Sequence, residues 1–382
     1  MKFKDRAGVY VKTMEGVNAF IPKPLPPDPG IKIDMEMMNL ISLAERKLGS
    51  LSAITPKLPN PEMFVAMYVN KEALLSSQIE GTQASFIDVL EASRKKEDRG
   101  GILEVINYVN ALNFGLERLD TLPLSLRLIK EIHSLLLQTG RGSVQAPGEF
   151  RRTQNWIGAP GSTLNTAAYI PPSVPEMEKA MSDLEKYFYK KSELPQLIKI
   201  ALIHAQFETI HPFVDGNGRM GRLLITFWLC QQEILTKPLL YLSYYFKMKR
   251  DEYYDKLTRI RTEGDWEGWI KFFLDGVACV AEEAMSSANE IIDLLENIAE
   301  TLTEKYPSNN NYQRLLNTLF EMPLITKKDV KEALDVSYPT ASMLVETFED
   351  LGYLSDTTPN QNRNKVYLFR DYINIIERGT EL

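Results

Sequence analysis

Apolar residues recur along most of this chain at spacings of three and four, and few stretches alternate between apolar and polar positions. This period predicts a mainly helical protein. One continuous helix is expected from Pro61 to Gly81, because proline is favoured in the first helical turn and glycine just beyond the last. Another begins at Ser85, where Asp88 completes a loose capping box. Further helices are expected at residues 102–119, 126–140, from about 175, 194–210, 222–230 and 286–306.

Two segments depart from the helical pattern. Residues 1–35 contain the proline-rich run IPKPLPPDPG, which cannot sustain a helix and predicts an extended arm lying on the body of the protein. Residues 149–172 are rich in Thr, Asn, Gly, Trp and Tyr, and this composition is typical of a small β-hairpin or an exposed flap.

The composition is that of a globular protein. Hydrophobic residues make up 44% of the 382 positions and charged residues 25%. The net charge of −7 argues against broad electrostatic capture of nucleic acid or anionic membrane, so any phosphate partner must be met locally. Cys230 and Cys279 lie far apart and form no zinc-binding spacing. With no signal-like N-terminus and no apolar run of about 18 residues, we expect a cytoplasmic protein without a membrane partner.

The chemistry is concentrated in HPFVDGNGRMGR, residues 211–222. Its GNGRMG matches the pattern GxGxxG of dinucleotide-binding proteins, but that fingerprint needs a preceding strand, and here a helix comes first. The glycines instead open the next helix, whose free N–H groups and dipole favour an anion. This interpretation assigns phosphate contacts to the glycines of the stretch, which are Gly216, Gly218 and Gly221.

The charged residues of the same stretch complete the predicted site. Arg219 and Arg222 are three positions apart, so both guanidinium groups can reach phosphate oxygens from one side of the helix. Asp215 would repel phosphate unless a divalent cation lay between them, which predicts a nucleoside triphosphate with Mg²⁺. His211 is the candidate general base. For the other two histidines, His133 and His204, we favour a structural role.

These twelve residues resemble the Fic family signature HPFx(D/E)GNGRxxR at every specified position. The resemblance covers about residues 40–295 and implies a Fic-type helical bundle. It also implies transfer of AMP from ATP to a Ser, Thr or Tyr hydroxyl of a target protein, or of the enzyme itself. By motif position, Asn217 and the glycine backbone would cradle phosphate, Arg219 and Arg222 would hold the outer phosphates, and Phe213 would pack in the core.

Two further segments acquire a role from the resemblance. The flap, with Trp156 and Ile157, would hold a target segment by backbone pairing. SSQIEG, residues 76–81, is similar to the inhibitory motif (S/T)xxxE(G/N) of Fic proteins. Ser76, Glu80 and Gly81 take its specified positions, which implies that Glu80 pairs with Arg222 and denies it to the γ-phosphate. Glu80 is also expected to orient water for the reverse removal of AMP.

The nucleotide base is not specified by any motif. Four tyrosines are candidate ring partners for adenine, although aromatic residues at helical spacing more often belong to a core; they are Tyr244, Tyr245, Tyr253 and Tyr254. From these patterns we expect an N-terminal arm and helical region at 1–115, a catalytic core at 116–305 and a third part at 306–382.

The third part resembles a winged helix, with helical patterns at 315–322, 326–335 and 337–352 and a turn-rich hairpin at 353–369. In that family the third helix reads DNA, which would direct Tyr338, Thr340 and Ser342 at bases. A transcriptional regulator with a nucleotide-sensing Fic part is therefore the alternative function. Residues 301–382 carry 9 basic and 12 acidic side chains, a net of −3, so protein contact or homodimer formation is favoured over DNA.

Overall fold

The computed structural model describes residues 3–13, 16–58, 60–95, 101–140, 142–235, 237–361 and 363–381. The fold is mainly helical, as the sequence predicts. Its α-helices are α1 Met35–Ile54, α2 Pro61–Ile79, α3 Phe86–Lys95, α4 Ile102–Leu119, α5 Leu126–Leu136, α6 Val174–Tyr189, α7 Gln196–Ile210, α8 Asn217–Gln231, α9 Ser243–Met248, α10 Arg250–Glu263, α11 Trp266–Lys305, α12 Asn311–Glu321, α13 Lys327–Leu334, α14 Tyr338–Asp350 and α15 Arg370–Ile376. The 3₁₀ helices are η1 Phe3–Asp5 and η2 Thr55–Lys57.

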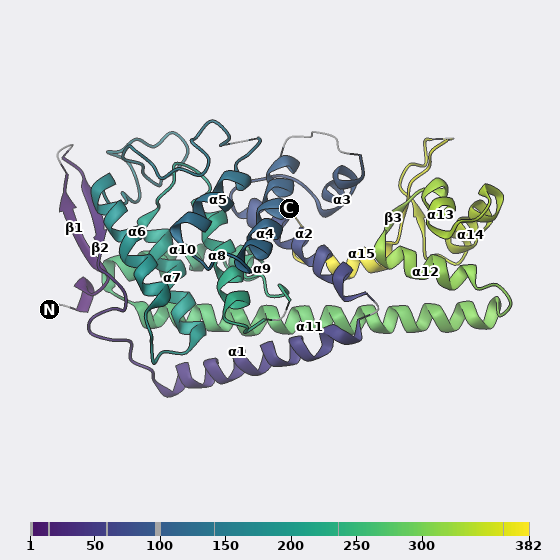
Figure 1. Ribbon diagram of the computed structural model, residues 1–382, viewed down its shortest axis with the longest axis horizontal. Coiled ribbons are helices and arrows are strands. Elements are labelled where there is room, and N and C mark those ends of the chain that lie inside the picture. Colours follow the sequence, from purple (N-terminus) through teal and green to yellow (C-terminus); the bar gives the residue numbers. More distant parts are fainter. Residues whose placement is uncertain are drawn as a thin grey trace.

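Two helices, α7 and α8, form the centre of the bundle (Figure 1). Almost every residue of both is buried, which is why their apolar positions do not form a single stripe. The indole of Trp269 on α11 donates a hydrogen bond to the backbone oxygen of Ala201 at 2.8 Å and joins α11 to this centre. The turn between α7 and α8, which carries residues 211–216, is therefore held by a rigid support.

The 40-residue helix α11 runs along one side of the whole molecule, and α1 packs along it (Figure 1). It extends from the central bundle to the C-terminal elements and ends at Lys305. No helix within the described ranges is long and apolar enough to cross a membrane.

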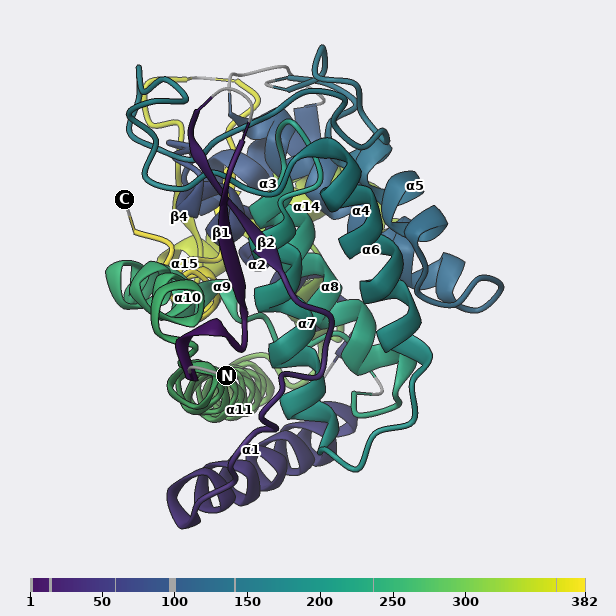
Figure 2. The same ribbon diagram turned by 90° about the vertical axis from the view of Figure 1, so that its left-hand side faces the viewer.

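The N-terminal arm is more regular than its sequence predicts. Residues Gly8–Lys12 (β1) pair antiparallel with Asn18–Pro22 (β2), and Val9 lies opposite Ile21 (Figure 2). The proline-rich segment overlaps the end of β2 and then runs to Gly30 without helix or strand, with bends at two of its prolines. Arg6 anchors the arm by a salt bridge of 2.8 Å to Glu267 at the start of α11. The strand pairing was missed because it depends on two segments meeting, and neither shows a clear alternation.

Helix α2 begins and ends where the sequence predicts. The Asn60 side chain accepts a hydrogen bond from the Met63 N–H at 3.1 Å, and Pro61 occupies the first turn. The helix stops at Glu80, because Gly81 adopts a left-handed conformation with φ of +99°. Glu80 is thus the C-cap residue of α2.

The C-terminal elements follow the order helix, strand, helix, helix, strand, strand. The short strands β3 (Leu324–Ile325), β4 (Ser355–Asp356) and β5 (Tyr367–Leu368) form an antiparallel sheet in the order β3-β5-β4. The predicted hairpin at 353–369 is therefore present as β4 and β5. The winged-helix assignment remains a prediction.

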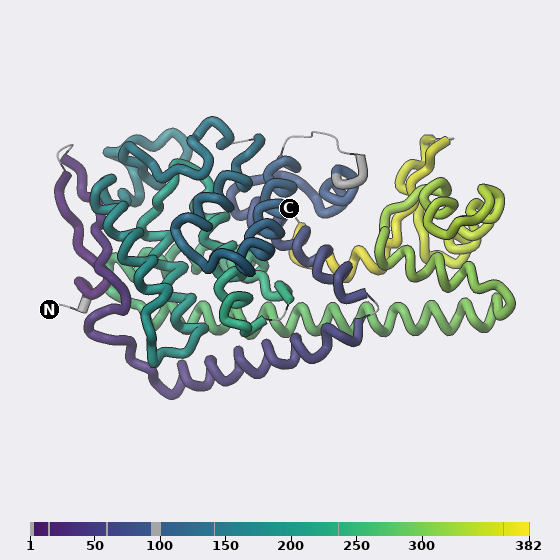
Figure 3. The backbone as a smooth tube through the Cα atoms, viewed as in Figure 1, coloured from purple at the N-terminus to yellow at the C-terminus, as the bar shows by residue number. Residues whose placement is uncertain are grey.

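Helix α15 was not predicted, and it returns the chain to the bundle. It packs on α11 and α2, so the end of the described chain lies beside the C-terminal end of α2 (Figure 3). Lys247 donates to the backbone oxygens of Gly379 at 3.2 Å and Glu381 at 2.5 Å, and to the Gln78 side chain at 2.8 Å. Gln78 also donates to the Thr380 carbonyl at 2.9 Å.

Candidate active site

The turn from α7 to α8 places the motif residues by two left-handed backbone conformations. His211 caps α7 with φ of 51°, and Gly216 precedes α8 with φ of 77°. Glycine reaches such φ values without strain, and any side chain at Gly216 would also lie 3.3 Å from His133 Nε2. The chain thus reverses tightly enough to bring His211 beside the first turn of α8.

Asn217 locks this turn. Its side-chain oxygen accepts from the Phe213 N–H and its amide donates to the Phe213 carbonyl, both at 2.9 Å. The Phe213 ring is fully buried and stacks on His133 with centroids 3.6 Å apart, consistent with the core role assigned to it. The Asn217 side chain thus holds the turn through both ends of its amide, and the phosphate cradle assigned to Asn217 stays a prediction.

The flap supports the same turn from the other side. The Arg151 N–H bonds the Pro212 carbonyl at 2.9 Å, and Arg151 Nε bonds the His211 carbonyl at 3.1 Å. Asn155 donates to the Phe213 carbonyl at 3.0 Å. Sequence reasoning missed Arg151 and Asn155; their only signal was a position within the polar segment 149–172.

His211 is suited to accept a proton. Burial of the ring and the nearby Arg151 guanidinium lower the pKa of His211 to about 4, whereas Glu80 acts in the opposite direction. The imidazole is therefore neutral at pH 7. Its Nδ1 has no hydrogen-bond partner among the described residues. The ring is half-buried, so it remains accessible from the site.

Arg219 is buried and lacks full pairing. Its nearest carboxylates are Asp215, 3.7 Å from Nη2, and Glu104, 3.9 Å from Nη1. Its Nε and Nη1 have no hydrogen-bond partner in the described part of the chain. Since a buried guanidinium normally has its donors satisfied, these groups fit an incoming anion such as phosphate. Glu104 was not predicted as a site residue.

Asp215 is the one carboxylate of the motif that could face a cation. The Asp215 side chain accepts a hydrogen bond from the N–H of the next residue, Gly216, at 2.6 Å. Within the described ranges no group of three or more His, Cys, Asp or Glu residues forms a metal cage. Mg²⁺ commonly takes one carboxylate together with phosphate oxygens and water, so Asp215 fits a cation that arrives with a nucleotide.

Arg222 is the most constrained residue of the site. Nη2 donates to Glu80 Oε1 at 2.7 Å and to the Ser76 carbonyl at 2.9 Å, and Nε donates to Ser76 Oγ at 2.8 Å. Burial alone would raise the pKa of Glu80, but the Arg222 charge outweighs this effect and holds the pKa below its usual range. Both partners are therefore ionised at neutral pH. The predicted inhibitory and arginine residues thus meet in space.

The Glu80 carboxylate also covers the N-terminus of α8. A Cβ placed on Gly218 would lie only 2.3 Å from Glu80 Oε1 and 3.0 Å from Arg222 Nη1. The carboxylate therefore lies at the start of α8, where the helix dipole favours a negative group, and it binds Arg222 there. The carboxylate of the chain's own Glu80 thus takes the place where an external anion would be most favoured.

Glu208 adds a further carboxyl that sequence reasoning did not single out. It is buried on α7, and a Cβ on Gly221 would lie 2.2 Å from its Oε1. Burial raises the pKa of Glu208 to about 7. Gly221 therefore serves close packing of α7 on α8. His204 packs nearby, with Nδ1 2.8 Å from the Gly221 carbonyl, in the structural role expected for it.

The predicted adenine partners separate in space. Tyr254 is 40% exposed on α10, and burial together with the Glu80 carboxylate raises its pKa, so it borders the site. Tyr253 is buried and bonds His204 at 3.0 Å, and Tyr245 is buried against α11. Tyr244 does not border the site: its ring lies 5.4 Å from Lys71 Nζ and covers Gly379 of the C-terminal tail.

The flap forms a single antiparallel bridge, between Ile157 and Tyr169, instead of a longer hairpin. Both Ile157 backbone groups are used by Tyr169, at 2.9 and 3.0 Å. Trp156 donates its indole N–H to the Ser162 carbonyl at 3.0 Å. Trp156 and Ile157 are about two-fifths exposed, at 42% and 39%, but the Ile157 backbone is already paired within the flap.

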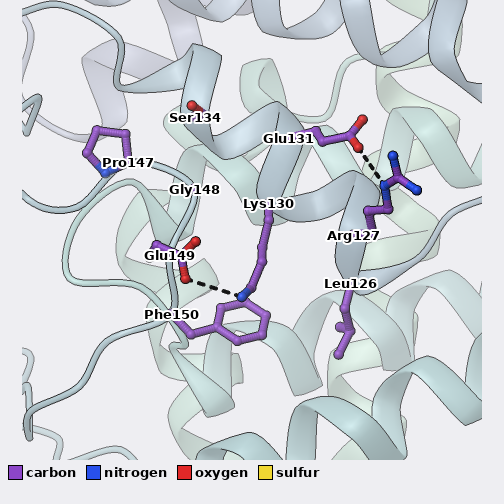
Figure 4. A pocket seen from close by; sticks show the side chains of 9 residues that line it. All are labelled: Leu126, Arg127, Lys130, Glu131, Ser134, Pro147, Gly148, Glu149 and Phe150. Carbon is purple, nitrogen blue, oxygen red and sulfur yellow. Dashed lines mark hydrogen bonds and ion pairs between the residues drawn. The ribbon is translucent and has the colours of Figure 1, made fainter.

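A shallow groove of about 560 Å³ lies between α5 and the base of the flap (Figure 4). Lys130 sits 4.6 Å from the Phe150 ring centre and 3.5 Å from Glu149 on its floor. The groove contains none of the motif residues, and Phe150 separates it from Phe213. It therefore contributes no chemistry to the site.

Comparison with known proteins agrees with this geometry. Residues 38–117 match the Fic/DOC family N-terminal region, and residues 123–229 match the Fic/DOC family. Over these two regions the chain is similar to the Fic/DOC family. The matched regions include the Ser76–Gly81 motif and the 211–222 motif.

Among curated relatives, the protein adenylyltransferase Fic of Drosophila grimshawi is 29% identical over 172 residues, 44% of this chain and 31% of that protein. The protein of the same name from Aedes aegypti is 28% identical over 217 residues, 56% of this chain and 39% of that protein. This chain thus covers between about three and four tenths of the length of these two relatives.

Solved structures support the fold. The structure of a Fic family protein from Desulfovibrio desulfuricans matches with a TM-score of 0.59 at 20% identity. The match covers 89% of this chain and 97% of the Desulfovibrio chain. A Fic domain containing signaling protein from Bacteroides thetaiotaomicron has a TM-score of 0.52 at 18% identity, with coverage of 66% and 97%.

Proposed function

We propose that this protein is a protein adenylyltransferase that transfers AMP from ATP to a hydroxyl group of a target protein and is held inactive by Glu80. One observation carries the proposal: a carboxylate of the chain itself is bound at the anion-favouring N-terminus of α8, 2.7 Å from Arg222. An arginine and a helix N-terminus that bind one anion so closely are suited to bind another. The relatives named protein adenylyltransferase support phosphate as that anion.

The proposed reaction uses the neutral imidazole of His211. It takes the proton of the attacking hydroxyl as that oxygen forms a bond to the α-phosphorus of ATP. The bond from this phosphorus to the bridging oxygen breaks, and pyrophosphate leaves with the electron pair. Arg219 and Arg222 stabilise the outer phosphates by charge. Mg²⁺ at Asp215, when bound, would neutralise phosphate charge and favour departure of pyrophosphate.

Inhibition follows from competition for Arg222. While Glu80 holds Nη2, the γ-phosphate cannot take the same donor. If the pair favours the closed arrangement by about 3 kcal/mol, under about one per cent of molecules would be competent. A single side chain can therefore set the activity.

Intact-mass measurement after separate incubations with ATP and with UTP, each with Mg²⁺, tests the proposal. We expect Glu80→Gly to gain AMP on itself or on an added target, wild type to gain far less, and Glu80→Gly/His211→Ala to gain none. Equal gains in wild type and Glu80→Gly would remove the inhibitory role. A mass gain that matches UMP or phosphate would mean that the protein transfers that group and not AMP. Incubating the modified protein without ATP tests Glu80-dependent removal of AMP, and no release across divalent metals would exclude it.

For the C-terminal elements we propose protein contact instead of DNA binding. Helix α14 contains no Lys or Arg, whereas Tyr338 and Met343 on it are 54% and 44% exposed. A DNA-reading helix needs cations or amides near the phosphates and bases. A gel shift on genomic fragments with a steep dependence on salt would favour the transcriptional regulator instead.

A further inference from the structure

Arg222 has a second set of partners that does not involve Glu80. Ser76 binds it twice, through Oγ to Nε and through its carbonyl to Nη2. Nη1 takes part in neither contact, and it lies 3.0 Å from the position of a Cβ on Gly218, at the start of α8. Ser76 therefore orients the guanidinium so that Nη1 faces the anion position, whether or not Glu80 is present.

Ser76 is in turn backed by a buried chain of hydroxyl groups. Its side chain neighbours Tyr108 on α4, and the Tyr108 hydroxyl donates a hydrogen bond to Glu72 Oε1 at 2.9 Å. Ser243 donates to the same oxygen at 2.5 Å. These side chains are all at most 2% exposed.

The direction of this chain is determined by its two ends. Arg222 can only donate, and Glu72 Oε1 accepts from both Tyr108 and Ser243. Each hydroxyl between them has one proton, so Ser76, which accepts from Arg222, can donate to Tyr108, which donates to Glu72. The chain therefore leads from a buried cation to the buried carboxyl group of Glu72.

We propose that Ser76, Tyr108 and Glu72 are positioning residues that hold Arg222 toward the nucleotide phosphates in the active state. This inference rests on the proposed function, and it gives Ser76 a role opposite to that of Glu80 within the same motif. When Glu80 leaves, a buried guanidinium without partners would be strongly disfavoured. The chain from Ser76 to Glu72 keeps two of its hydrogen bonds and a carboxyl group behind it, so Arg222 stays in place for phosphate.

The test compares two adjacent serines in the active Glu80→Gly background. Ser76 and Ser77 are both fully buried, but Ser77 Oγ has no hydrogen-bond partner in the described residues and is the matched control. We expect Ser76→Ala to raise the KM for ATP about tenfold or more, because a hydrogen bond to a charged group is lost. Ser77→Ala should leave KM and kcat unchanged. Tyr108→Phe should raise the KM for ATP less than Ser76→Ala does. Ser76→Thr keeps the hydroxyl group and should keep the KM of the Glu80→Gly background.

Affinity for a non-hydrolysable ATP analogue, measured by calorimetry, separates this inference from the proposed function. A tenfold loss of affinity in Ser76→Ala but not in Ser77→Ala supports positioning even if no AMP transfer is seen. Equal affinity in both variants overturns it, as does unchanged KM in an active enzyme. If Ser76→Ala fails to fold, Tyr108→Phe decides: unchanged KM and affinity in that variant overturn the inference.

Discussion

Glu80 Oε1 accepts a hydrogen bond from Arg222 Nη2 at 2.7 Å, across 142 positions of sequence. The same oxygen lies against Gly218 Cα at the start of α8. The end of helix α2 and the start of helix α8 thus meet through one carboxylate and one guanidinium. We expect substitutions of Glu80 to relieve inhibition, and substitutions at Gly218 to weaken binding of the anion.

Gly218→Ala should not activate the enzyme, although it displaces Glu80. The added methyl group would lie 2.3 Å from Glu80 Oε1, but it would fill the same space above the helix N-terminus that a phosphate needs. We expect Glu80→Gly/Gly218→Ala to bind an ATP analogue at least about tenfold more weakly than Glu80→Gly, measured by calorimetry. Gly49→Ala, where nothing lies within 4 Å of the new Cβ, is the control. Unchanged affinity would show that the anion does not approach Gly218.

Asn217→Ala should destabilise the protein and not merely weaken nucleotide binding. It removes two buried hydrogen bonds to the Phe213 backbone, so the free energy of unfolding should fall by about 2 to 3 kcal/mol. Asn217→Asp should be worse, because a carboxylate oxygen would face the Phe213 carbonyl. Urea unfolding of both variants, with exposed Asn110→Ala as reference, measures the effect. Stability equal to wild type would leave Asn217 only its predicted phosphate-binding role.

His133 should make stability depend on pH. Burial lowers the pKa of His133 to about 4, below the ordinary value of 6.5, so between these values only the unfolded chain takes up the proton. Stability contributed by the neutral ring is therefore lost as pH falls below 6.5. The destabilisation caused by His133→Gln should be smaller at pH 5 than at pH 7 by about 2 kcal/mol. Urea unfolding at the two pH values checks this.

Glu208 should change stability with pH in the opposite direction to His133, and it serves as the comparison. Its pKa is raised to about 7, so the folded state takes up a proton before the unfolded chain does, and stability rises as pH falls toward 4.5. Relative to wild type, Glu208→Gln should therefore lose stability between pH 7 and pH 5. Shifts of the same sign in both variants would contradict these assignments.

The rate of AMP transfer by Glu80→Gly should be nearly constant from pH 8 to about 5. The pKa of His211 is about 4, and Glu80 holds it up, so removing Glu80 lowers it further and the imidazole stays neutral. Initial rates at saturating ATP, with stability checked at each pH, provide the measurement. A fall in rate centred near pH 6.5 would mean that the imidazole is protonated near its ordinary pKa, contrary to the burial seen at this turn.

Much of the site was predictable because its signals are local. The residues of 211–222 lie within twelve positions, and the glycines and arginines act through one helix start. The end of α2 is likewise set by neighbouring residues, with Gly81 directly after Glu80. Only the family resemblance suggested that these two segments meet.

The roles that sequence reasoning missed depend on distant contacts. The sequence did not show that the Asn217 amide bonds the Phe213 backbone through both its oxygen and its nitrogen. Tyr244 looked like a partner for adenine, yet the returning C-terminal tail covers its ring. The neighbouring sequence gives no signal for either contact, because each depends on which residues the fold packs against the side chain.

By itself, the sequence determined the helical periodicity, the ends of α2 and the chemical groups at the start of α8, because each depends on residues within a few turns of one another. Only the tertiary structure decided which side of α2 faces Arg222, that Ser76, Tyr108 and Glu72 lie beside one another, and that α15 returns to Gln78. The reason is physical: hydrogen-bond partners and burial are set by the packing of helices distant in sequence, and that packing minimises the free energy of the whole chain.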